Sequence, residues 1–145
     1  MLRNIDPILS PDCLHILRSM GHGDDLVIAD CNFPSANCAK RLVRMDGISG
    51  TDALAAIVKL FPIDDFVTDP ILRISVVGAP DQLPPVCVEY QKIVDQYADN
   101  PAKIQPIDRF AFYDRAKNAF AVIATGESRL YGCLILKKGV IRPAA

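Results

Sequence analysis

The first residue whose setting points to chemistry is His22, one of two histidines in the chain, which lies between Gly21 and Gly23. A histidine both takes and gives a proton near neutral pH. Glycines beside it permit unusual backbone angles and the close approach of a ligand. His22 is therefore a candidate acid/base group, although a histidine that only hydrogen-bonds the last carbonyls of a helix fits the same position.

Asp30 is the second candidate, because it closes the apolar run "DLVIAD" that starts at Asp25. A carboxylate at the exposed end of a buried strand can accept two hydroxyl hydrogen bonds from a polyol, or it can orient a histidine. The alternative interpretation makes Asp30 an ordinary turn or capping residue.

Arg109 occurs with Tyr113 and Lys117 at helical spacing in "IDRFAFYDRAKNAF". It lies in the first turn of the expected helix, where the helix dipole does not favour a cation. Its forked donors suit a carboxylate or vicinal hydroxyls. A surface ion pair with Asp108 or Asp12 is the alternative.

Tyr131 and Gly132 stand at the start of another apolar run, "YGCLIL". A tyrosine hydroxyl can act as an acid or as a hydrogen-bond donor in a dry site, while Gly132 exposes backbone amides. Tyrosines at strand starts are also common packing residues. A thiolate pair of Cys31 with His22 is a further option, but no third orienting group is evident.

The sequence lacks the motifs and charge patterns that several other classes of protein require. The chain has no CxxC motif and no phosphate-binding glycine loop, so we expect no metal site and no cofactor. Its five cysteines are expected to be reduced core thiols.

Charges of both signs are mixed to a net −1, which argues against a nucleic-acid partner. No apolar run approaches a membrane span and no signal peptide is apparent, so a cytoplasmic protein without membrane contact is expected.

Helices and strands alternate along the sequence. Capping residues and apolar periodicity predict helices that begin at Pro11, Thr51, Pro85 and Asp108. The first is expected to end at Gly21 and the second at Pro62. Covered strands are predicted over residues 25–30, 41–47, 71–78, 120–127 and 131–139, and the last two are expected to be joined by a turn around Gly126.

This alternation predicts one α/β domain over residues 1–145, a three-layer α/β/α sandwich with a mixed, largely parallel sheet of about six strands. Ligands of such sheets bind beyond strand ends where loops converge. We expect His22, Asp30 and Tyr131 to lie there together. The mean hydropathy of +0.20 is high for a small monomer and indicates subunit interfaces.

With these residues collected, the sequence resembles the sugar mutarotase family that contains fucose mutarotase and ribose pyranase, and it is most similar to the fucose mutarotase branch. The resemblance runs almost end to end. The segments that carry it are "MLRNIDPILSPD", "MGHGDDLVIAD", "FP", "DRFAFYDRAKNAFAVIATGE", "YG" and "LKKGV".

The resemblance implies a three-layer fold and a homo-oligomer, typically a decameric ring with sites near subunit boundaries. It implies an isomerase that interconverts the α and β anomers of a free monosaccharide without metal or cofactor. His22 then corresponds to the catalytic histidine, Asp30 and Arg109 to sugar-binding positions, and Tyr131 with Gly132 to the last binding segment. Tyr131 is also a candidate for proton transfer.

Two positions depart from the fucose branch. Asn32 stands where that branch usually has histidine, and Cys133 stands in the binding segment where it usually has asparagine. A thiol cannot replace both the donor and the acceptor of an amide, so the preferred sugar stays open between L-fucose and related sugars. A non-catalytic sugar-binding or regulatory ring with the same pocket is the main alternative, and a thiol-dependent enzyme built on Cys31 or Cys133 is a third.

Overall fold

The structure is a computed structural model that describes all of residues 1–145. Its helices are α1 (Pro11–Ser19), α2 (Ser35–Cys38), α3 (Gly50–Val58), α4 (Pro85–Tyr97) and α5 (Arg109–Asn118). Its strands are β1 (Asp25–Ala29), β2 (Leu42–Met45), β3 (Ile71–Ile74), β4 (Gln105–Ile107), β5 (Ala121–Thr125) and β6 (Leu134–Lys137).

The six strands form one sheet in the order β2-β5-β1-β6-β3-β4. The pairings β2 with β5, β5 with β1, and β3 with β4 are parallel, whereas β6 runs antiparallel to both β1 and β3. The predicted mixed, largely parallel sheet is therefore confirmed. The connection from β5 to β6, expected as a turn around Gly126, is a longer loop over residues 126–133, because β1 lies between these two strands and the loop crosses its end.

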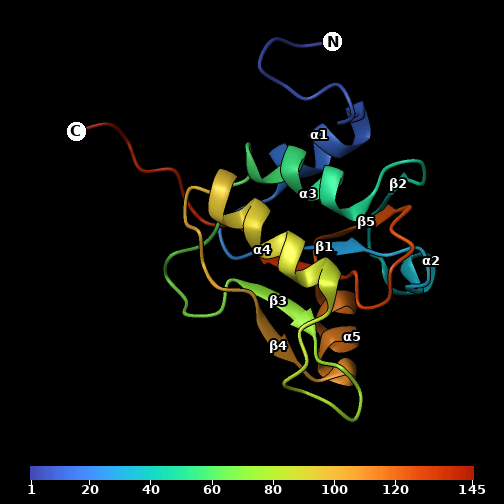
Figure 1. The fold of residues 1–145 in the computed structure, drawn as a ribbon. Coiled ribbons are helices and arrows are strands. Elements are labelled where there is room, and N and C mark those ends of the chain that lie inside the picture. Colours follow the sequence, from blue (N-terminus) through green and yellow to red (C-terminus); the bar gives the residue numbers. More distant parts are fainter.

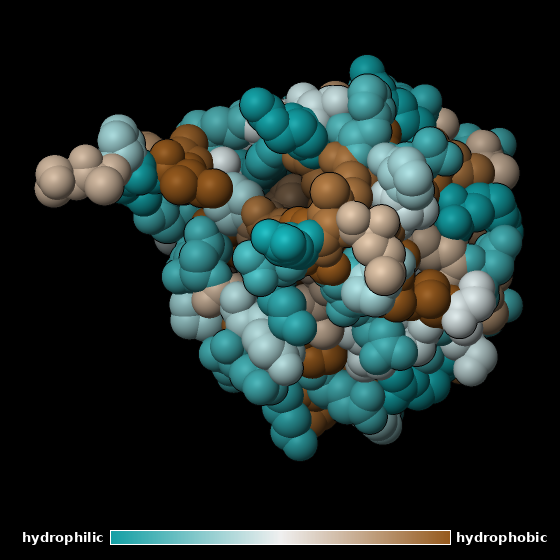
Figure 2. Space-filling model, turned by 90° about the horizontal axis from the view of Figure 1, so that it is seen from above, coloured by the Kyte–Doolittle hydropathy of each residue, from teal (hydrophilic) through white to brown (hydrophobic).

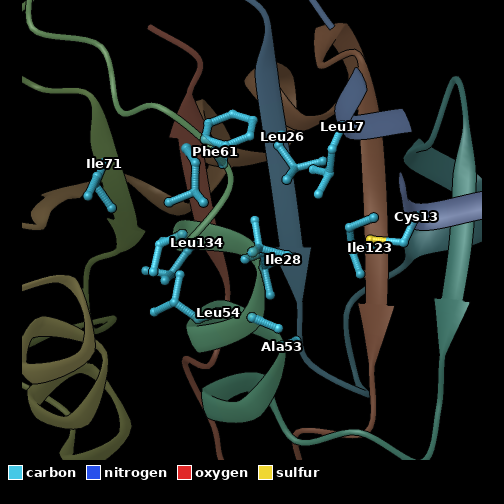
Figure 3. Packing of buried hydrophobic residues seen from close by; sticks show 14 of the residues in the cluster. Cys13, Leu17, Leu26, Ile28, Ala53, Leu54, Phe61, Ile71, Ile123 and Leu134 are labelled. Atoms are coloured by element: carbon cyan, nitrogen blue, oxygen red, sulfur yellow. The ribbon is translucent and has the colours of Figure 1, made fainter. Parts of the chain in front are cut away.

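Helices cover both faces of the sheet. Figure 1 shows α1, α3 and α4 on one side and α5 on the other. The side chains of β1 alternate between the two layers, because Leu26 and Ile28 join the larger apolar cluster while Val27 and Ala29 join the smaller one. Figure 3 shows Leu26 and Ile28 in the larger cluster with Leu54 of α3. Burial of each such large side chain contributes about 1.5–3 kcal/mol.

The helix starts follow the predicted chemistry in three of four cases. Ser10 caps α1 by accepting the Cys13 amide hydrogen, Pro85 is the first residue of α4, and Asp108 caps α5. The start predicted at Thr51 is wrong, because Ser49 is the residue that caps α3 by accepting the Asp52 amide hydrogen.

The end of α1 also differs from the prediction. The helix ends at Ser19, and the residue with a left-handed backbone is Gly23 (φ 85°) rather than Gly21. The reason lies in the following turn, where the Asp24 carboxylate accepts the Gly21 amide hydrogen. His22 is thus held in a tight turn before β1, beyond the helix rather than on its last carbonyls.

Two short elements carry too little pattern to be predicted. Helix α2 has only one turn, and β4 has three residues with Pro106 at its centre. A proline is tolerated there because β4 is an edge strand, whose outer side needs no hydrogen-bond partner. No helix in the structure combines the length and the apolar character that crossing a membrane requires.

Candidate functional site

Asp30 lies directly after the carboxyl end of β1, and its carboxylate is held by two backbone amides. The Asn32 amide donates to Oδ1 over 3.0 Å, and the Gly132 amide donates to Oδ2 over 3.2 Å. Asp30 is only 8% exposed. Each carboxylate oxygen retains a second lone pair, so the group can still accept hydroxyl hydrogens from a ligand. The simple turn interpretation is thereby insufficient, since the carboxylate joins two distant segments at the pocket.

Tyr131 has an unusual backbone. Its φ of 63° is left-handed, which is uncommon for a bulky residue and marks strain that the surroundings must hold. The Tyr131 carbonyl accepts the Cys87 thiol hydrogen, and the Tyr131 hydroxyl accepts the Val77 amide hydrogen over 3.2 Å. Because the hydroxyl oxygen already accepts that amide, its own hydrogen is available for a ligand.

Arg109 and Tyr113 line a pocket together with Asp30 and Tyr131. The pocket has a volume of about 210 Å³ and is also lined by Asn32 and Cys133. That volume lies below the range of about 300–1,000 Å³ typical of drug-sized ligands and suits one small molecule. Arg109 makes no ion pair and Asp108 instead caps α5, so the alternative interpretation, a surface pair with Asp108 or Asp12, is not formed.

A buried carboxylate supports the loop that carries Tyr131 and Gly132. Glu127 accepts hydrogen bonds from the Arg129 guanidinium and from the Gly50 amide. The Arg129 hydrogen bonds hold the pKa of Glu127 below its ordinary value. The Tyr90 hydroxyl donates to the Gly132 carbonyl over 2.8 Å, and burial raises the pKa of Tyr90 far above its usual value. Neither residue was found from the sequence, because both support the site from elsewhere in the fold.

His22 is not at this pocket. It precedes β1, whereas Asp30 follows it, and the five residues of the strand at about 3.3 Å each separate the two by about 16 Å. The prediction that His22 lies beside Asp30 and Tyr131 is therefore wrong within a single chain. The physical reason is that an extended strand separates the residues that flank it, so His22 and Asp30 lie beyond opposite ends of β1.

Before the start of β1, His22 contacts a residue that the sequence did not indicate as part of a site. Its Nε2 lies 3.1 Å from Oδ1 of Asp64, whose side chain is 2% exposed, while the imidazole is 44% exposed. The phenyl ring of Phe66 packs at 4.9 Å from the imidazole. Asp64 follows the predicted helix end at Pro62, and no local pattern connects positions 22 and 64.

Cys31 and His22 do not form the thiolate pair that the sequence left open. Cys31 is exposed beside Asp30, at the far end of β1 from His22. Cys133 is buried and its sulfur accepts the Asp30 amide hydrogen over 3.3 Å. Burial raises the pKa of Cys133 well above its ordinary value, which keeps the thiol neutral. No group of three or more potential metal ligands occurs in the structure.

A three-layer α/β domain with one mixed sheet and a small pocket beyond the end of its central strand belongs to the class of layered α/β proteins. Within that class, the chain belongs to the RbsD / FucU transport protein family, whose sequence model matches residues 3–141. The resemblance noted from the sequence is thereby confirmed.

Curated relatives match over nearly the full length. The fucose mutarotase of Danio rerio is 43% identical over 150 residues, which cover 99% of this chain and 96% of the relative. The L-fucose mutarotase of Histophilus somni (strain 2336) is also 43% identical, with 97% of each chain covered.

Solved structures support the same fold. The fucose mutarotase from Streptococcus pneumoniae, solved in complex with L-fucose, superposes with a TM-score of 0.90 at 40% identity and covers 97% of this chain and 100% of its own. Bacillus subtilis RbsD, solved with D-ribose, has a TM-score of 0.74 at 22% identity, covering 98% of this chain and 100% of its own. At that identity the second likeness shows the fold alone.

Proposed function

We propose that this protein is a mutarotase that interconverts the α and β anomers of L-fucose or a related free monosaccharide. The observation that carries the proposal is the pocket in which Asp30, Arg109 and Tyr131 converge, in a chain 43% identical to fucose mutarotases over nearly its full length. Asp30 supplies acceptors, and Arg109 and Tyr131 supply donors. Such a set orients a polyol.

The reaction requires two proton transfers and no change of oxidation state. One group gives a proton to the ring oxygen, another takes the proton of the anomeric hydroxyl, and the bond between the anomeric carbon and the ring oxygen breaks to give the aldehyde. The carbonyl then rotates and the ring closes with the protons returned. His22 acts on one of these protons, and the Tyr131 hydroxyl, whose hydrogen is available, is the candidate for the other.

Because His22 lies at the far end of β1, one chain cannot bring both ends to one sugar. We propose that the pocket of one copy is completed by His22 of a second copy in a homo-oligomer. The exposure of the imidazole supports this arrangement, since its free edge is accessible to another molecule. A decameric ring with sites at subunit boundaries, in the cytoplasm, is the assembly we propose.

An apolar hollow on the surface also supports self-association. Figure 2 shows brown, apolar residues around a hollow on the face seen from above. A cavity of about 480 Å³ near α1 is lined by Leu2, Leu14, Leu17, Leu60, Phe61 and Ile141. Ile141 is 80% exposed. Exposed apolar surface of this kind commonly marks an interface.

The sugar preference depends on Cys133 and Asn32. The Cys133 sulfur faces the Asp30 amide and has no amide group to offer a hydroxyl. A sugar that would need both a donor and an acceptor at this point loses one contact. Because fucose mutarotases of two organisms are 43% identical to this chain over nearly its full length, we propose L-fucose as the first substrate to test, with related free sugars beside it.

Exchange spectroscopy separates this enzyme from a ring that only binds sugar. At equilibrium, a mutarotase transfers magnetisation between the α and β anomeric proton signals without net reaction. Equilibrated L-fucose, galactose, ribose and rhamnose are each measured with and without the protein. Enhanced exchange for L-fucose or one of the others is expected. Binding without enhanced exchange for all four would instead identify the non-catalytic ring.

A further inference from the structure

The segment "LKKGV", which ends β6 and continues past it, is bonded to the turn that carries His22. The Gly23 amide donates to the Lys138 carbonyl over 2.8 Å, and the Lys138 amide donates to the Asp24 carbonyl over 2.9 Å. Both bonds lie on the side of His22 where the turn leads into β1. The backbone of Lys138 therefore fixes the end of the turn.

The side chain of Lys138 holds the beginning of the same turn. Its Nζ donates to the Leu17 carbonyl over 2.8 Å and to the Met20 carbonyl over 2.6 Å. In a continuing helix the Leu17 carbonyl would accept the Gly21 amide hydrogen, but that amide donates to the Asp24 carboxylate instead. An ammonium group at the carboxyl end of a helix is also favoured by the helix dipole. Lys138 is therefore the group that caps the end of α1.

Lys138 thus holds the chain on both sides of His22, with its side chain before the histidine and with its backbone after it. Lys137 adds a further contact, because its Nζ donates to the Gly23 carbonyl over 3.3 Å and to the Asp25 carboxylate over 2.9 Å. The glycines that flank His22 have no Cβ to restrict their backbone angles. Contacts from outside the turn must therefore fix the direction in which the half-exposed imidazole points.

We propose that Lys138 is a positioning residue for His22, whose ammonium group fixes the end of α1 so that the turn presents the imidazole where proton transfer requires it. This inference rests on the proposed mutarotase function. Lys138 itself transfers no proton. A displacement of about 1 Å at a reacting group can lower a rate about 10²-fold. Sugar binding depends on the pocket at the other end of β1, so the loss should fall on kcat rather than on KM.

Lys138→Met tests the consequence for catalysis, because methionine fills similar space but donates no hydrogen bond. In the anomer exchange assay, kcat is expected to fall about 10- to 100-fold with KM changed less than about twofold. Lys138→Arg keeps a charged donor of similar reach and should restore kcat to within about threefold of the unmodified protein. An unchanged kcat in the folded Lys138→Met variant, or a rise in KM as large as the loss in kcat, would overturn the proposal.

Hydrogen–deuterium exchange with mass spectrometry measures the order of the turn in the same variants. Peptides that cover residues 17–24 should exchange at least about tenfold faster in Lys138→Met, while peptides from the rest of the chain exchange as before. Lys138→Arg should keep the slow exchange. Unchanged exchange over residues 17–24 in Lys138→Met would show that the ammonium group does not hold the turn. Faster exchange there without a fall in kcat would refute the positioning role.

Lys92→Met is the matched control, since Lys92 lies exposed on α4, away from the turn. Both kcat and the hydrogen exchange of residues 17–24 should stay as in the unmodified protein. A loss of kcat in Lys92→Met equal to that in Lys138→Met would mean that the effect is not specific to the turn and would overturn the proposal.

Acetylation of the unmodified protein with acetic anhydride tests the same contact without any variant. Because two carbonyls engage its amine, Lys138 should react at least about tenfold more slowly than Lys92. Equal rates for the two lysines would overturn the proposal. If Lys138 reacts slowly and residues 17–24 are protected, but the unmodified protein gives no anomer exchange, the proposed function fails while the hold of Lys138 on the turn stands.

Discussion

The Gly132 amide donates a hydrogen bond to Oδ2 of Asp30 over 3.2 Å and so joins residues 102 positions apart in the sequence. This contact connects the end of β1 to the loop that enters β6. It fixes the carboxylate beside Tyr131, whose strained backbone lies one residue earlier. The pocket is therefore organised by the backbone of the loop as much as by its side chains.

Replacing Gly132 with alanine should damage this loop. A Cβ at this position would lie 2.7 Å from Glu127 Cγ and 3.1 Å from the Arg129 carbonyl, so the loop must shift. We expect a loss of about 1–3 kcal/mol in the free energy of unfolding, together with weaker sugar binding. Gly47→Ala is the control, because its added Cβ meets nothing within 4 Å. Equal stability of the two variants in thermal unfolding would contradict the close packing described.

Arg109 should contribute mainly to sugar binding. Arg109→Gln removes forked donors that have no partner within the chain, and we expect KM to rise about 10-fold with a smaller change in kcat. Lys117→Gln on the same helix is the control, since Lys117 is exposed and does not line the pocket. An unchanged KM for Arg109→Gln in the exchange assay would remove Arg109 from the binding site.

Glu127 should make the fold sensitive to acid. Arg129 holds the pKa of Glu127 below its ordinary value of 4.5, so the carboxyl group binds a proton less readily in the folded than in the unfolded chain. Its stabilising effect is fully present above about pH 4.5 and is lost as the pH falls through the lowered value. Glu127→Gln should therefore be less stable at neutral pH and lose less stability on acidification.

Denaturant unfolding across this pH range measures the effect. Glu89→Gln is the control, because Glu89 pairs with the same Arg129 but is half-exposed, where ion pairs contribute little. A Glu127→Gln variant as stable as Glu89→Gln at neutral pH, with the same acid response as the unmodified protein, would show that the Glu127 contact is not stabilising.

His22 should carry the proton transfer. His22→Ala is expected to lower the anomer exchange rate about 10²- to 10⁴-fold, which is the usual contribution of a positioned acid/base group. The folded oligomer should persist, because the imidazole is partly exposed and contributes little to the core. His15→Ala, which removes the only other histidine, should keep full activity. A similar rate for both variants would exclude His22 from the reaction.

Much of the layered fold was predictable, because helix caps and apolar periodicity are local signals. Ser10 and Asp108 cap their helices as expected, and the runs around Leu26 and Ile123 form central strands. The order of the strands was not predictable in detail. Sheet order depends on long-range packing, and the apolar run of β5 is compatible with several neighbours.

The candidate site, too, was only partly predictable from the sequence. Asp30, Arg109 and Tyr131 do meet in one pocket. Asp30 follows β1, Arg109 comes shortly after β4, and Tyr131 comes shortly before the antiparallel β6, so all three lie beyond the same ends of neighbouring strands. His22 was misplaced because its distance from Asp30 in the sequence is short, whereas an extended strand separates them in space. Asp64 was missed because its contact with His22 joins positions 42 residues apart without any shared motif.

The central claim is that a site combines His22 of one copy with the Asp30 pocket of another. Co-expression of His22→Ala with Asp30→Asn tests it most directly, because each variant alone is expected to be strongly impaired. In randomly mixed oligomers, about a quarter of the sites pair an intact His22 with an intact Asp30 from different copies, so about a quarter of the unmodified exchange rate should return. An exchange rate no higher than that of the separately expressed variants would contradict the shared site.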